Sequence, residues 1–387
     1  DPVFSFSESD CDVYVGSLNY DPVDPFANTN GIGIYKTDVA TLLSGSCDPD
    51  QFSDLSDEDC WPTRRYAAFS ADPTHFFDKE WFDVGDTGDG EHVWVTYSDF
   101  DFTPTPPNPA GFTAEIFAVR CDAELTTCTA PLQISNDVDV QFSDVTIGPD
   151  QRTYLTWAKI EGELTGDAQT FTIKMRVAEP GATTFGPEQI VFVEDLAIPF
   201  GGFLHANDFR VDTYPKHEVR DLGGAYPRVY VVWDACTHRV IDVVCEEPVI
   251  WLSYSDDLGA TWSDRVAISD GGDNYFPSIA FDPEGNRLVA AWFTNRFDAK
   301  FHNRQDVELV RLSADGTARS THRLTRPSNE TEADPLLGGF FIGDYIEVFA
   351  QDRTAWVGYN ANYRQRRLLF EGIRVTQQDN YLTRVGV

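Results

Sequence analysis

Residues 255–262 read Ser-Asp-Asp-Leu-Gly-Ala-Thr-Trp and fit the pattern S-x-D-x-G-x-T-W at every fixed position. An apolar run at 249–254 precedes this stretch, and a second run at 265–269 follows it. Two strand-like runs that flank a short polar segment are typical of a β-hairpin. The stretch therefore predicts two antiparallel strands joined by a tight turn.

The residue types at the fixed positions explain how such a turn would close. Asp257, two residues after Ser255, can accept backbone N–H bonds within the turn, and Gly259 can take a positive φ. Thr261 can close the loop through its hydroxyl, and Trp262 can fold back onto the sheet as an apolar plug. We expect these five residues to have a structural role.

A short apolar pattern that often ends in an aromatic residue recurs along the whole chain, which makes an internal repeat the main organising feature. The equivalent positions of its six copies are Tyr14, Trp94, Tyr154, Tyr230, Val289 and Trp356. A second strand-like run follows each copy, another precedes most copies, and a closing run ends most of them. This pattern predicts three or four antiparallel strands in each of six repeats.

The repeat predicts an all-β chain folded as one six-bladed β-propeller of four-stranded antiparallel blades, which leaves few strand edges exposed. The expected single domain spans 1–387. Its approximate blades are 1–62, 76–135, 141–194, 207–269, 275–326 and 341–384. A pair of β-sandwiches is the alternative, and the extent of the repeat over the full chain favours the propeller.

The charge of the chain bounds its partners. The 387 residues carry a formal net charge of −34, and the sequence pI is about 4.3. Nucleic acid and anionic membranes are therefore excluded on electrostatic grounds, and no apolar run approaches the length of a membrane span. Only six of the 29 basic residues are Lys, which suits either a saline environment or a secreted acidic protein.

Seven cysteines are present, and none has zinc-ligand spacing. Three local pairs would each close a loop between strand-like runs: Cys47–Cys60, Cys121–Cys128 and Cys236–Cys245. Interpreted as disulfides, they place the protein outside the reducing cytoplasm, in an extracellular, periplasmic or cell-surface location. Cys11 is left over, and seven reduced cysteines are the alternative.

The stretch 255–262 resembles the Asp-box, or BNR repeat, of the sialidase superfamily, whose members are β-propellers. Asp78-Lys79-Glu80-Trp81 and Phe341-Ile342-Gly343-Asp344-Tyr345-Ile346 are also similar to sialidase-type propeller sequences. With the repeat, the resemblance covers nearly the entire chain and looks closest to uncharacterised bacterial sialidase-like proteins. It implies a carbohydrate ligand, and it implies that the Asp-box lies away from the active site.

Members of this family bind the substrate carboxylate with three Arg, use a Tyr paired with a Glu as nucleophile, and use an Asp as acid/base. In a propeller, residues just before the innermost strands face the central channel. The resemblance thus points to four candidate catalytic residues: Tyr345, Asp344, Asp78 and His205. The candidate substrate-binding residues are Arg64, Arg65, Lys79, Arg210 and Arg296.

Roles follow from residue type. Tyr345 beside the charged Asp344 could be a nucleophile, Asp78 could be the acid/base, and the Arg side chains could hold an anionic sugar. The family's Arg-Ile-Pro signature is absent here, and Arg64 and Arg65 belong to the stretch of sequence that is most similar to it. For each residue the alternative is structural: acid–base pairs that join adjacent blades, and a core position for Tyr345.

Two functions fit this set. One is a secreted glycoside hydrolase or polysaccharide lyase that acts on an acidic glycan; a lyase would use His205, His75 or Tyr345 as base. The other is a non-catalytic adhesion or assembly propeller, with self-association open. Convergence of several Arg and a Tyr–acid pair at one end of the channel would favour the enzyme.

Neither function requires a cofactor, but three Asp-rich loops offer the hard oxygen ligands that suit a structural Ca²⁺ ion. They are Asp86-Thr87-Gly88-Asp89, Asp99-Phe100-Asp101 and Asp270-Gly271-Gly272-Asp273, and none matches an EF-hand. The single glycosylation sequon is Asn329-Glu330-Thr331.

Overall fold

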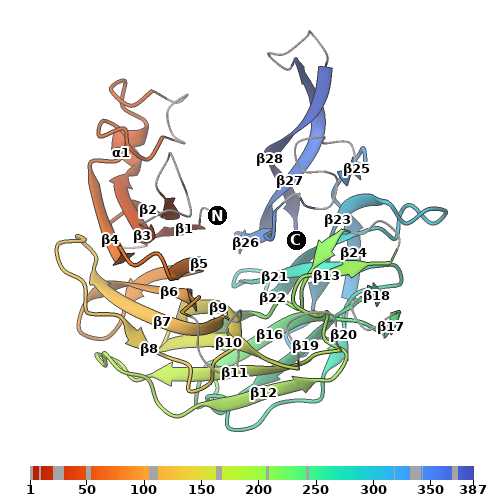
Figure 1. Cartoon of the computed structure of the whole chain (residues 1–387), viewed down its shortest axis with the longest axis horizontal. Coiled ribbons are helices and arrows are strands. Elements are labelled where there is room, and N and C mark those ends of the chain that lie inside the picture. Colours follow the sequence, from red (N-terminus) through yellow and green to blue (C-terminus); the bar gives the residue numbers. More distant parts are fainter. Residues whose placement is uncertain are drawn as a thin grey trace. The chain divides into compact units, whose positions relative to one another are not determined.

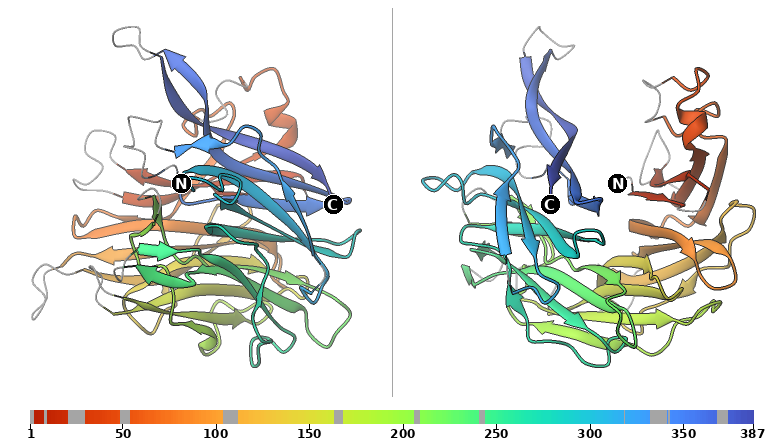
Figure 2. Two further views of the ribbon diagram at one scale, coloured as in Figure 1. Left: turned by 90° about the vertical axis from the view of Figure 1, so that its right-hand side faces the viewer. Right: turned by 180° about the vertical axis from the view of Figure 1, so that it is seen from behind.

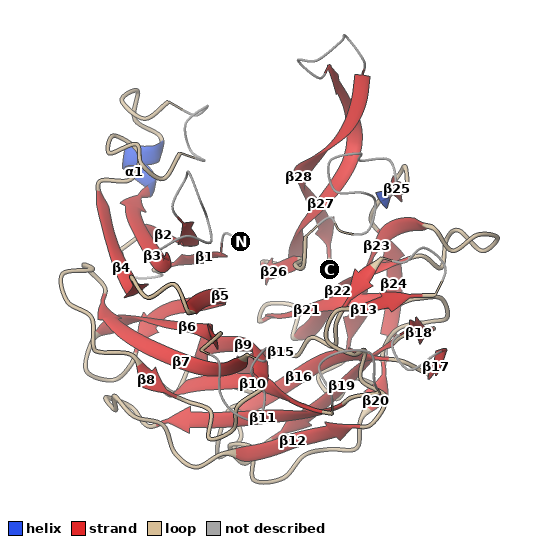
Figure 3. Cartoon of the chain, viewed as in Figure 1, coloured by secondary structure: helices blue, strands red, loops and turns tan. Residues whose placement is uncertain are grey.

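The structure is a computed structural model in which strands dominate (Figure 3). It describes residues 3–7, 10–20, 30–48, 54–103, 112–162, 168–205, 209–240, 244–317, 319–331, 341, 343–367 and 374–387. Within these ranges the one α-helix is α1 (Val39–Leu42), which begins where Asp38 accepts a hydrogen bond from Thr41 N at 2.8 Å. No helix of the described residues is long and apolar enough to span a membrane.

Two compact units make up the chain. Unit 1 consists of Asp1–Lys159, Ile173–Val191 and Asp221–Pro227, and unit 2 of Ile160–Thr172, Phe192–Arg220 and Arg228–Val387. Each unit contains antiparallel sheets whose strands follow one another in chain order (Figure 1). A single domain over 1–387 and a ring of six blades stay predictions.

The first three sheets have four strands each. The first contains β1 (Val3–Phe6), β2 (Asp12–Tyr20), β3 (Asn30–Asp38) and β4 (Thr63–Ser70). The second contains β5 (His75–Asp86), β6 (Glu91–Asp101), β7 (Thr113–Asp122) and β8 (Leu132–Gln133). The third contains β9 (Val140–Ile147), β10 (Thr153–Glu161), β11 (Thr170–Ala178) and β12 (Gln189–Glu194). Because β4 pairs with β3, the first sheet continues to Ser70, past the expected blade end at residue 62.

Three further sheets follow in unit 2. The fourth contains β15 (Lys216–Arg220), β16 (Arg228–Ala235), β19 (Val249–Ser255) and β20 (Val266–Ala267). The fifth contains β21 (Asn274–Asp282), β22 (Arg287–Thr294), β23 (Arg304–Leu312) and β24 (Arg319–Arg323), and β25 (Asn329–Glu330) also pairs with β23. The sixth contains β26 (Glu347–Gln351) and the long hairpin of β27 (Thr354–Arg367) and β28 (Arg374–Gly386), blue in Figure 2.

A small extra sheet was not expected from the sequence. It contains β14 (Arg210–Val211), β13 (Gly202–Leu204), β18 (Val244–Glu246) and β17 (His238–Val240), and β13 pairs with β18 in parallel. Its strands have two or three residues, which is too short for an alternating pattern to be recognised.

Each copy of the apolar repeat forms the second strand of its sheet, namely β2, β6, β10, β16, β22 and β27. The strands β6, β10, β16 and β22 are buried along nearly their whole length, on both faces, and sheets of the same unit pack against one another. In unit 1, Trp94 of the second sheet contributes to one apolar cluster with Leu155 of the third. In unit 2, Tyr230 of the fourth sheet shares a cluster with Trp292 of the fifth. Burial on both sides explains why the pattern is continuous rather than alternating.

A β-bulge recurs in the first strand of three sheets. Two residues of the first strand oppose one aromatic residue of the second: 79–80 oppose Tyr97, 142–143 oppose Trp157, and 276–277 oppose Trp292. The first residue of each bulge has a positive φ, 56° at Lys79, 62° at Phe142 and 52° at Phe276. Such bulges re-aim side chains, and the strained φ is retained only where packing holds it. We call these features the first-strand bulges.

The turn at 255–262 closes through the hydrogen bonds that its residue types favour. The Asp257 carboxylate accepts from Thr261 N at 2.8 Å, from the Thr261 hydroxyl at 2.6 Å and from the Ser255 hydroxyl at 2.8 Å. Gly259 has a φ of 86°, and Trp262 Nε1 donates to the Gly259 carbonyl at 3.1 Å.

All three predicted disulfides are confirmed: Cys47–Cys60, Cys121–Cys128 and Cys236–Cys245. The bond from Cys121 to Cys128 lies between the third and fourth strands of its sheet, where the fourth sheet has the turn at 255–262. Asp122 accepts from Thr126 N and Thr127 N there, so a carboxylate and a disulfide act together. Cys11 is exposed and free.

Candidate functional site

The turn at 255–262 defines one end of its sheet, and the start of the first strand defines the other. The third strand β19 runs into the turn at Ser255, so the antiparallel first strand β15 starts, at Lys216, at the opposite end. In each sheet, residues that directly precede the first strand are therefore at the end of that sheet away from its third-to-fourth-strand turn. The candidates are described unit by unit.

In unit 2, an ion pair joins the small extra sheet to the segment before the sixth sheet. Arg210 of β14 donates from Nη2 to Asp344 Oδ1 at 2.5 Å, and its guanidinium lies 4.1 Å from the ring centre of Phe341. The Asp344 side chain is buried. A guanidinium between a carboxylate and an aromatic face is held in one orientation.

Tyr345 belongs to a row of three aromatic residues, which we call the aromatic row. Tyr345 packs edge-on against Tyr214 with ring centres 5.6 Å apart, and Tyr214 packs edge-on against Phe276 at 6.1 Å. Each of the three lies two residues before a paired residue of its first strand: before Lys216 and Glu347, where pairing begins, and before Ser278, where pairing resumes after the bulge.

Asp234, at the end of β16, holds the backbone of two members of the aromatic row. Its carboxylate accepts from Tyr214 N at 2.7 Å and from Phe276 N at 3.2 Å, and the residue is fully buried. Burial raises the pKa of Asp234 to about 8, although the two N–H bonds oppose the shift. Lys216 Nζ, also buried, lies 5.9 Å from the ring centre of Tyr214.

Arg210 can hold a carboxylate, and the partly exposed Tyr345 is the ring of the aromatic row that a sugar can reach, because Tyr214 and Phe276 are buried. Tyr214, Phe276 and Asp234 were missed as candidates at the sequence level. An alignment of the repeats on their second strands would have placed the first two beside Tyr345.

The first strand of the second sheet holds the unit 1 candidates. Asp78 and Lys79 flank the start of a first-strand bulge, and the next residue, Glu80, is fully buried. Neither Glu80 carboxylate oxygen has a hydrogen-bond partner among the described residues. Burial raises the pKa of Glu80 to about 8. Sequence reasoning had treated Glu80 only as part of a family-like stretch.

His75 begins the same strand and is oriented by Asp99. Its Nδ1 lies 2.9 Å and 3.0 Å from the two carboxylate oxygens. Partial burial acts to lower the pKa of His75, but the hydrogen bond and charge of Asp99 outweigh it, so the pKa lies above its ordinary value. The pair is an oriented imidazole of the kind that serves in proton transfer.

The other predicted site residues have their polar partners outside these groups. His205 directly follows β13 of the small sheet, and its exposed side chain lies 3.9 Å from Glu246. Arg296 pairs with the buried Glu308 and lies 4.5 Å from the ring centre of Phe297. Asp208 is outside the described residues.

Arg64 and Arg65 are on β4, the fourth strand of its sheet, not on a first strand. Arg64 donates to Glu58 at 2.6 Å, and Arg65 donates to the carbonyl of Thr126 at 2.7 Å. Thr126 is in the turn after β7, at the far end from the first-strand starts. We therefore leave both residues out of the candidate site.

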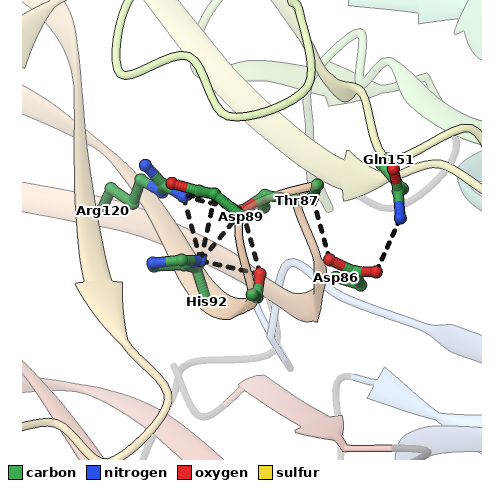
Figure 4. Close-up of polar contacts among 8 residues, drawn as sticks. Asp86, Thr87, Asp89, His92, Arg120 and Gln151 are labelled. Carbon is green, nitrogen blue, oxygen red and sulfur yellow. Dashed lines mark hydrogen bonds and ion pairs between the residues drawn. The ribbon is translucent and has the colours of Figure 1, made fainter.

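The Asp-rich loop at 86–89 directs its carboxylates to protein donors, as Figure 4 shows. Asp89 accepts from the buried Arg120, which also donates to Thr87 Oγ1 at 2.8 Å. Asp86 accepts from Gly88 N at 2.8 Å and from Gln151 Nε2 at 2.7 Å.

The other two loops are similar, since Asp99 bonds to His75 and Asp270 to Arg319 at 2.6 Å. Within the described ranges no group of three His, Cys, Asp or Glu side chains could hold a metal ion. Calcium at these loops stays a prediction. In the sequon, Asn329 is buried and donates to Gln305 Oε1 at 2.9 Å, so its amide is engaged within the folded chain.

No protein-family model matches the sequence, and no curated protein matches it. Among solved structures, the Hadza microbial sialidase Hz136 is similar over 93% of this chain, with a TM-score of 0.51 and 11% identity. The chain corresponds to 63% of the length of that protein. The Trypanosoma rangeli sialidase in complex with sialic acid is similar over 98% of this chain and 53% of its own, with a TM-score of 0.48 and 8% identity. The all-β sheets, their chain order and the likeness to Hz136 together show that the chain has a sialidase-like β-propeller fold.

Proposed function

We propose that the protein binds and hydrolyses an acidic glycan at the site formed in unit 2 by Arg210, Asp344, Tyr345 and the rest of the aromatic row. The observation that carries the proposal is the convergence of Arg210 and Asp344, 134 residues apart in the chain, directly beside a tyrosine at the start of the sixth sheet. The likeness of the fold to glycan-cleaving propellers supports it without assigning a substrate.

Each group has a role in this proposal. Arg210 holds the carboxylate of the sugar, which replaces Asp344 as its partner, and the buried Tyr214 orients the Tyr345 ring by edge-on packing. The Tyr345 oxygen bonds to the anomeric carbon as the glycosidic C–O bond breaks, and water then releases the sugar from the tyrosine. The proton that the Tyr345 hydroxyl loses balances the proton that the leaving oxygen gains. Asp78, which the sequence predicted as the acid/base, belongs to unit 1, and its role stays a prediction.

A uronate-containing polysaccharide would permit elimination instead. In that reaction a base removes the proton next to the carboxylate, and a cation stabilises the resulting anion. Tyr345 as base and Arg210 as cation would fill these roles. The product then carries a C=C bond that absorbs in the ultraviolet, whereas hydrolysis yields only a new reducing end.

The test is turnover of sialosides and uronate polysaccharides by the wild type and by Tyr345→Phe, with reducing ends and ultraviolet absorbance followed together. We expect the variant to lose at least 100-fold in kcat because the reacting oxygen is absent. The matched control is Tyr66→Phe, which removes the hydroxyl of an exposed tyrosine on β4 and should leave turnover unchanged. Equal activity of Tyr345→Phe and wild type would refute the assignment.

One observation favours a second candidate function, a non-catalytic adhesion or assembly propeller. The Arg210 guanidinium is already neutralised by Asp344 and covered by Phe341, which is the geometry of a structural ion pair. Absence of turnover on every substrate, with glycan binding retained, would support this alternative. The exposed Cys11 offers such a protein one route to self-association.

Three disulfides support action in an oxidising compartment, so we place the protein outside the cell, in a periplasm or on a cell surface. The proposed partner is a carbohydrate, and the proposed chemistry needs no cofactor.

A further inference from the structure

The loop between β22 and β23 and the short strand β25 enclose a pocket that the proposed reaction does not use. Its volume is about 120 Å³. The lining residues are Asp298, Phe301, Asn303, Arg304, Glu330 and Thr331. β22 ends at Thr294 and β23 begins at Arg304, so the pocket is at the end of its sheet away from the third-to-fourth-strand turns.

We infer that this pocket binds one residue of a neutral, hydroxyl-rich sugar, as a binding subsite separate from the proposed catalytic Tyr345. The inference concerns binding alone, and it holds whether or not the aromatic row performs catalysis.

Thr331 provides the first observation that points to a ligand. Its side chain is only 1% exposed, and its hydroxyl has no hydrogen-bond partner among the described residues. A buried hydroxyl left without a partner destabilises a fold by about 1–3 kcal/mol. A hydroxyl that lines a pocket in this state is positioned to bond a polar group of a bound molecule.

Phe301 provides the second observation. The ring is 60% exposed although it lines a concavity, and Lys300 Nζ lies 4.6 Å from its centre. An exposed aromatic face next to hydrogen-bonding groups matches the two surfaces of a pyranose, a C–H face and a rim of hydroxyls. The ring is thus placed to stack on the sugar.

Carboxylates supply the hydrogen-bond acceptors. Asp298 uses Oδ2 to accept from Asn303 N and Arg304 N, both at 3.3 Å, and its Oδ1 has no partner within the described part of the chain. Glu330 uses Oε1 in an ion pair with Arg304 Nε at 2.9 Å, and its Oε2 likewise has no described partner. These two oxygens can accept from sugar hydroxyls.

The same charges determine the class of sugar. The pocket lining has two carboxylates and one guanidinium, and that guanidinium is already paired with Glu330. With the Lys300 ammonium beside Phe301, the two carboxylates are matched by two cations, so no cation is left over to hold an anionic sugar. The pocket therefore suits a neutral sugar, in contrast to the acidic glycan proposed for the Arg210 site.

The walls are rigid enough to present these groups in fixed positions. In the loop, the buried Asn295 donates from Nδ2 to the His302 carbonyl at 2.9 Å, and His302 N donates to the Asp298 carbonyl at 2.9 Å. On the other wall, Asn362 N donates to Asn329 Oδ1 at 2.9 Å, which fixes β25 against β27 (Figure 1). Preorganisation of this kind lowers the entropic cost of binding.

The test is isothermal titration of the full chain with cellotriose, xylotriose, arabinotriose and maltotriose, and with trigalacturonate as the acidic comparison. We expect at least one neutral trisaccharide to bind with a millimolar or lower Kd, and trigalacturonate to bind at least ten-fold more weakly at this pocket. Phe301→Ala should weaken neutral binding at least ten-fold. The matched control is Phe349→Ala, which removes another exposed phenylalanine of unit 2 and should change the Kd less than two-fold.

Thr331→Val separates a binding role from a structural one. The change removes the hydroxyl and keeps the shape, so it should raise the thermal midpoint while it weakens sugar binding about three- to ten-fold. Binding of no neutral trisaccharide, or equal binding by wild type and Phe301→Ala, would overturn the inference. Tyr345→Phe should leave the Kd at this pocket unchanged, so failure of the catalytic proposal is distinguishable from failure of this one.

Discussion

At the scale of single residues, Glu80 is an acid at a position where the equivalent residues of the other two first-strand bulges cannot ionise. The corresponding second residues of the other two first-strand bulges are Ser143 and Pro277. Glu80 is fully buried, and the described residues offer its carboxylate no donor. Ionisation at that position is therefore opposed by the lost hydration of the charge.

This burial makes the stability of unit 1 depend on pH. The pKa of Glu80 in the folded chain is raised to about 8, above its ordinary value of 4.5. A group whose pKa is raised by folding contributes its full stability at pH values below its ordinary pKa. That contribution is lost as the pH rises through the pKa of the group in the folded chain. Between pH 5 and pH 8.5 we expect the free energy of unfolding to fall by about 1–3 kcal/mol from this group alone.

Glu80→Gln tests this dependence, because the amide cannot ionise. Urea unfolding at pH 5, 7 and 8.5 should show a shallower loss of stability in the variant than in the wild type. Glu58→Gln, at an exposed position of the same unit, serves as the control and should follow the wild type. A variant with the same slope as the wild type would contradict the prediction.

Residue types alone identified part of the candidate site. Tyr345, Asp344 and Arg210 could be nominated because they precede strand-like runs. Their contact could not be predicted, since Arg210 reaches Asp344 through the small extra sheet. The unbonded hydroxyl of Thr331 could not be predicted either. Whether a hydroxyl has a partner depends on which donors and acceptors the fold places within its reach.

At the scale of elements, the turn at 255–262 contributes to stability through a single carboxylate. Asp257→Ala removes three hydrogen bonds, from Thr261 N, the Thr261 hydroxyl and the Ser255 hydroxyl. We expect a loss of about 1–3 kcal/mol in the free energy of unfolding, because the turn is partly solvated and water replaces some of these bonds. Chemical denaturation measures the loss.

Asp264→Ala is the matched control, since Asp264 is exposed in the same connection and its carboxylate has no partner among the described residues. The control should change stability by less than 0.5 kcal/mol, as is usual for surface positions. An equal effect of the two changes would mean that the turn does not depend on the Asp257 carboxylate.

Strands and disulfides were predictable because they depend on local pattern. Each second strand is a mainly apolar run, and each disulfide joins cysteines 7 to 13 residues apart. The first-strand bulges were not predictable, because Lys79, Phe142 and Phe276 have no common side-chain chemistry. Their positive φ is imposed by pairing with the second strand and not by an intrinsic preference.

At the scale of the whole molecule, the excess of acidic residues dominates the electrostatics. With 63 acidic and 29 basic residues, like-charge repulsion outweighs the ion pairs that salt would weaken. Raising NaCl from 20 mM to 1 M shortens the screening length to about 3 Å. We expect the thermal midpoint at pH 7.5 to rise by several degrees, as measured by scanning calorimetry.

The control for this prediction is the same salt series near pH 4.3, the sequence pI, where net charge is close to zero. The salt effect should largely disappear there. A rise of equal size at both pH values would indicate that salt acts through hydrophobic burial and not through charge. Closure of the sheets into a six-bladed ring depends on contacts between distant segments, which no local pattern encodes, and it stays a prediction.

The first-strand bulges also have a consequence for engineering. On either side of each bulge the hydrogen-bond ladder keeps its register, so an exchange of the bulged side chain leaves the pairing of the sheet intact. The chain already accommodates a lysine at one such position and phenylalanines at two others, on the same backbone geometry. The side chains of Lys79, Phe142 and Phe276 are all buried, however, so an exchange at one of these positions keeps the strand register but has to be matched by changes in the packed neighbours.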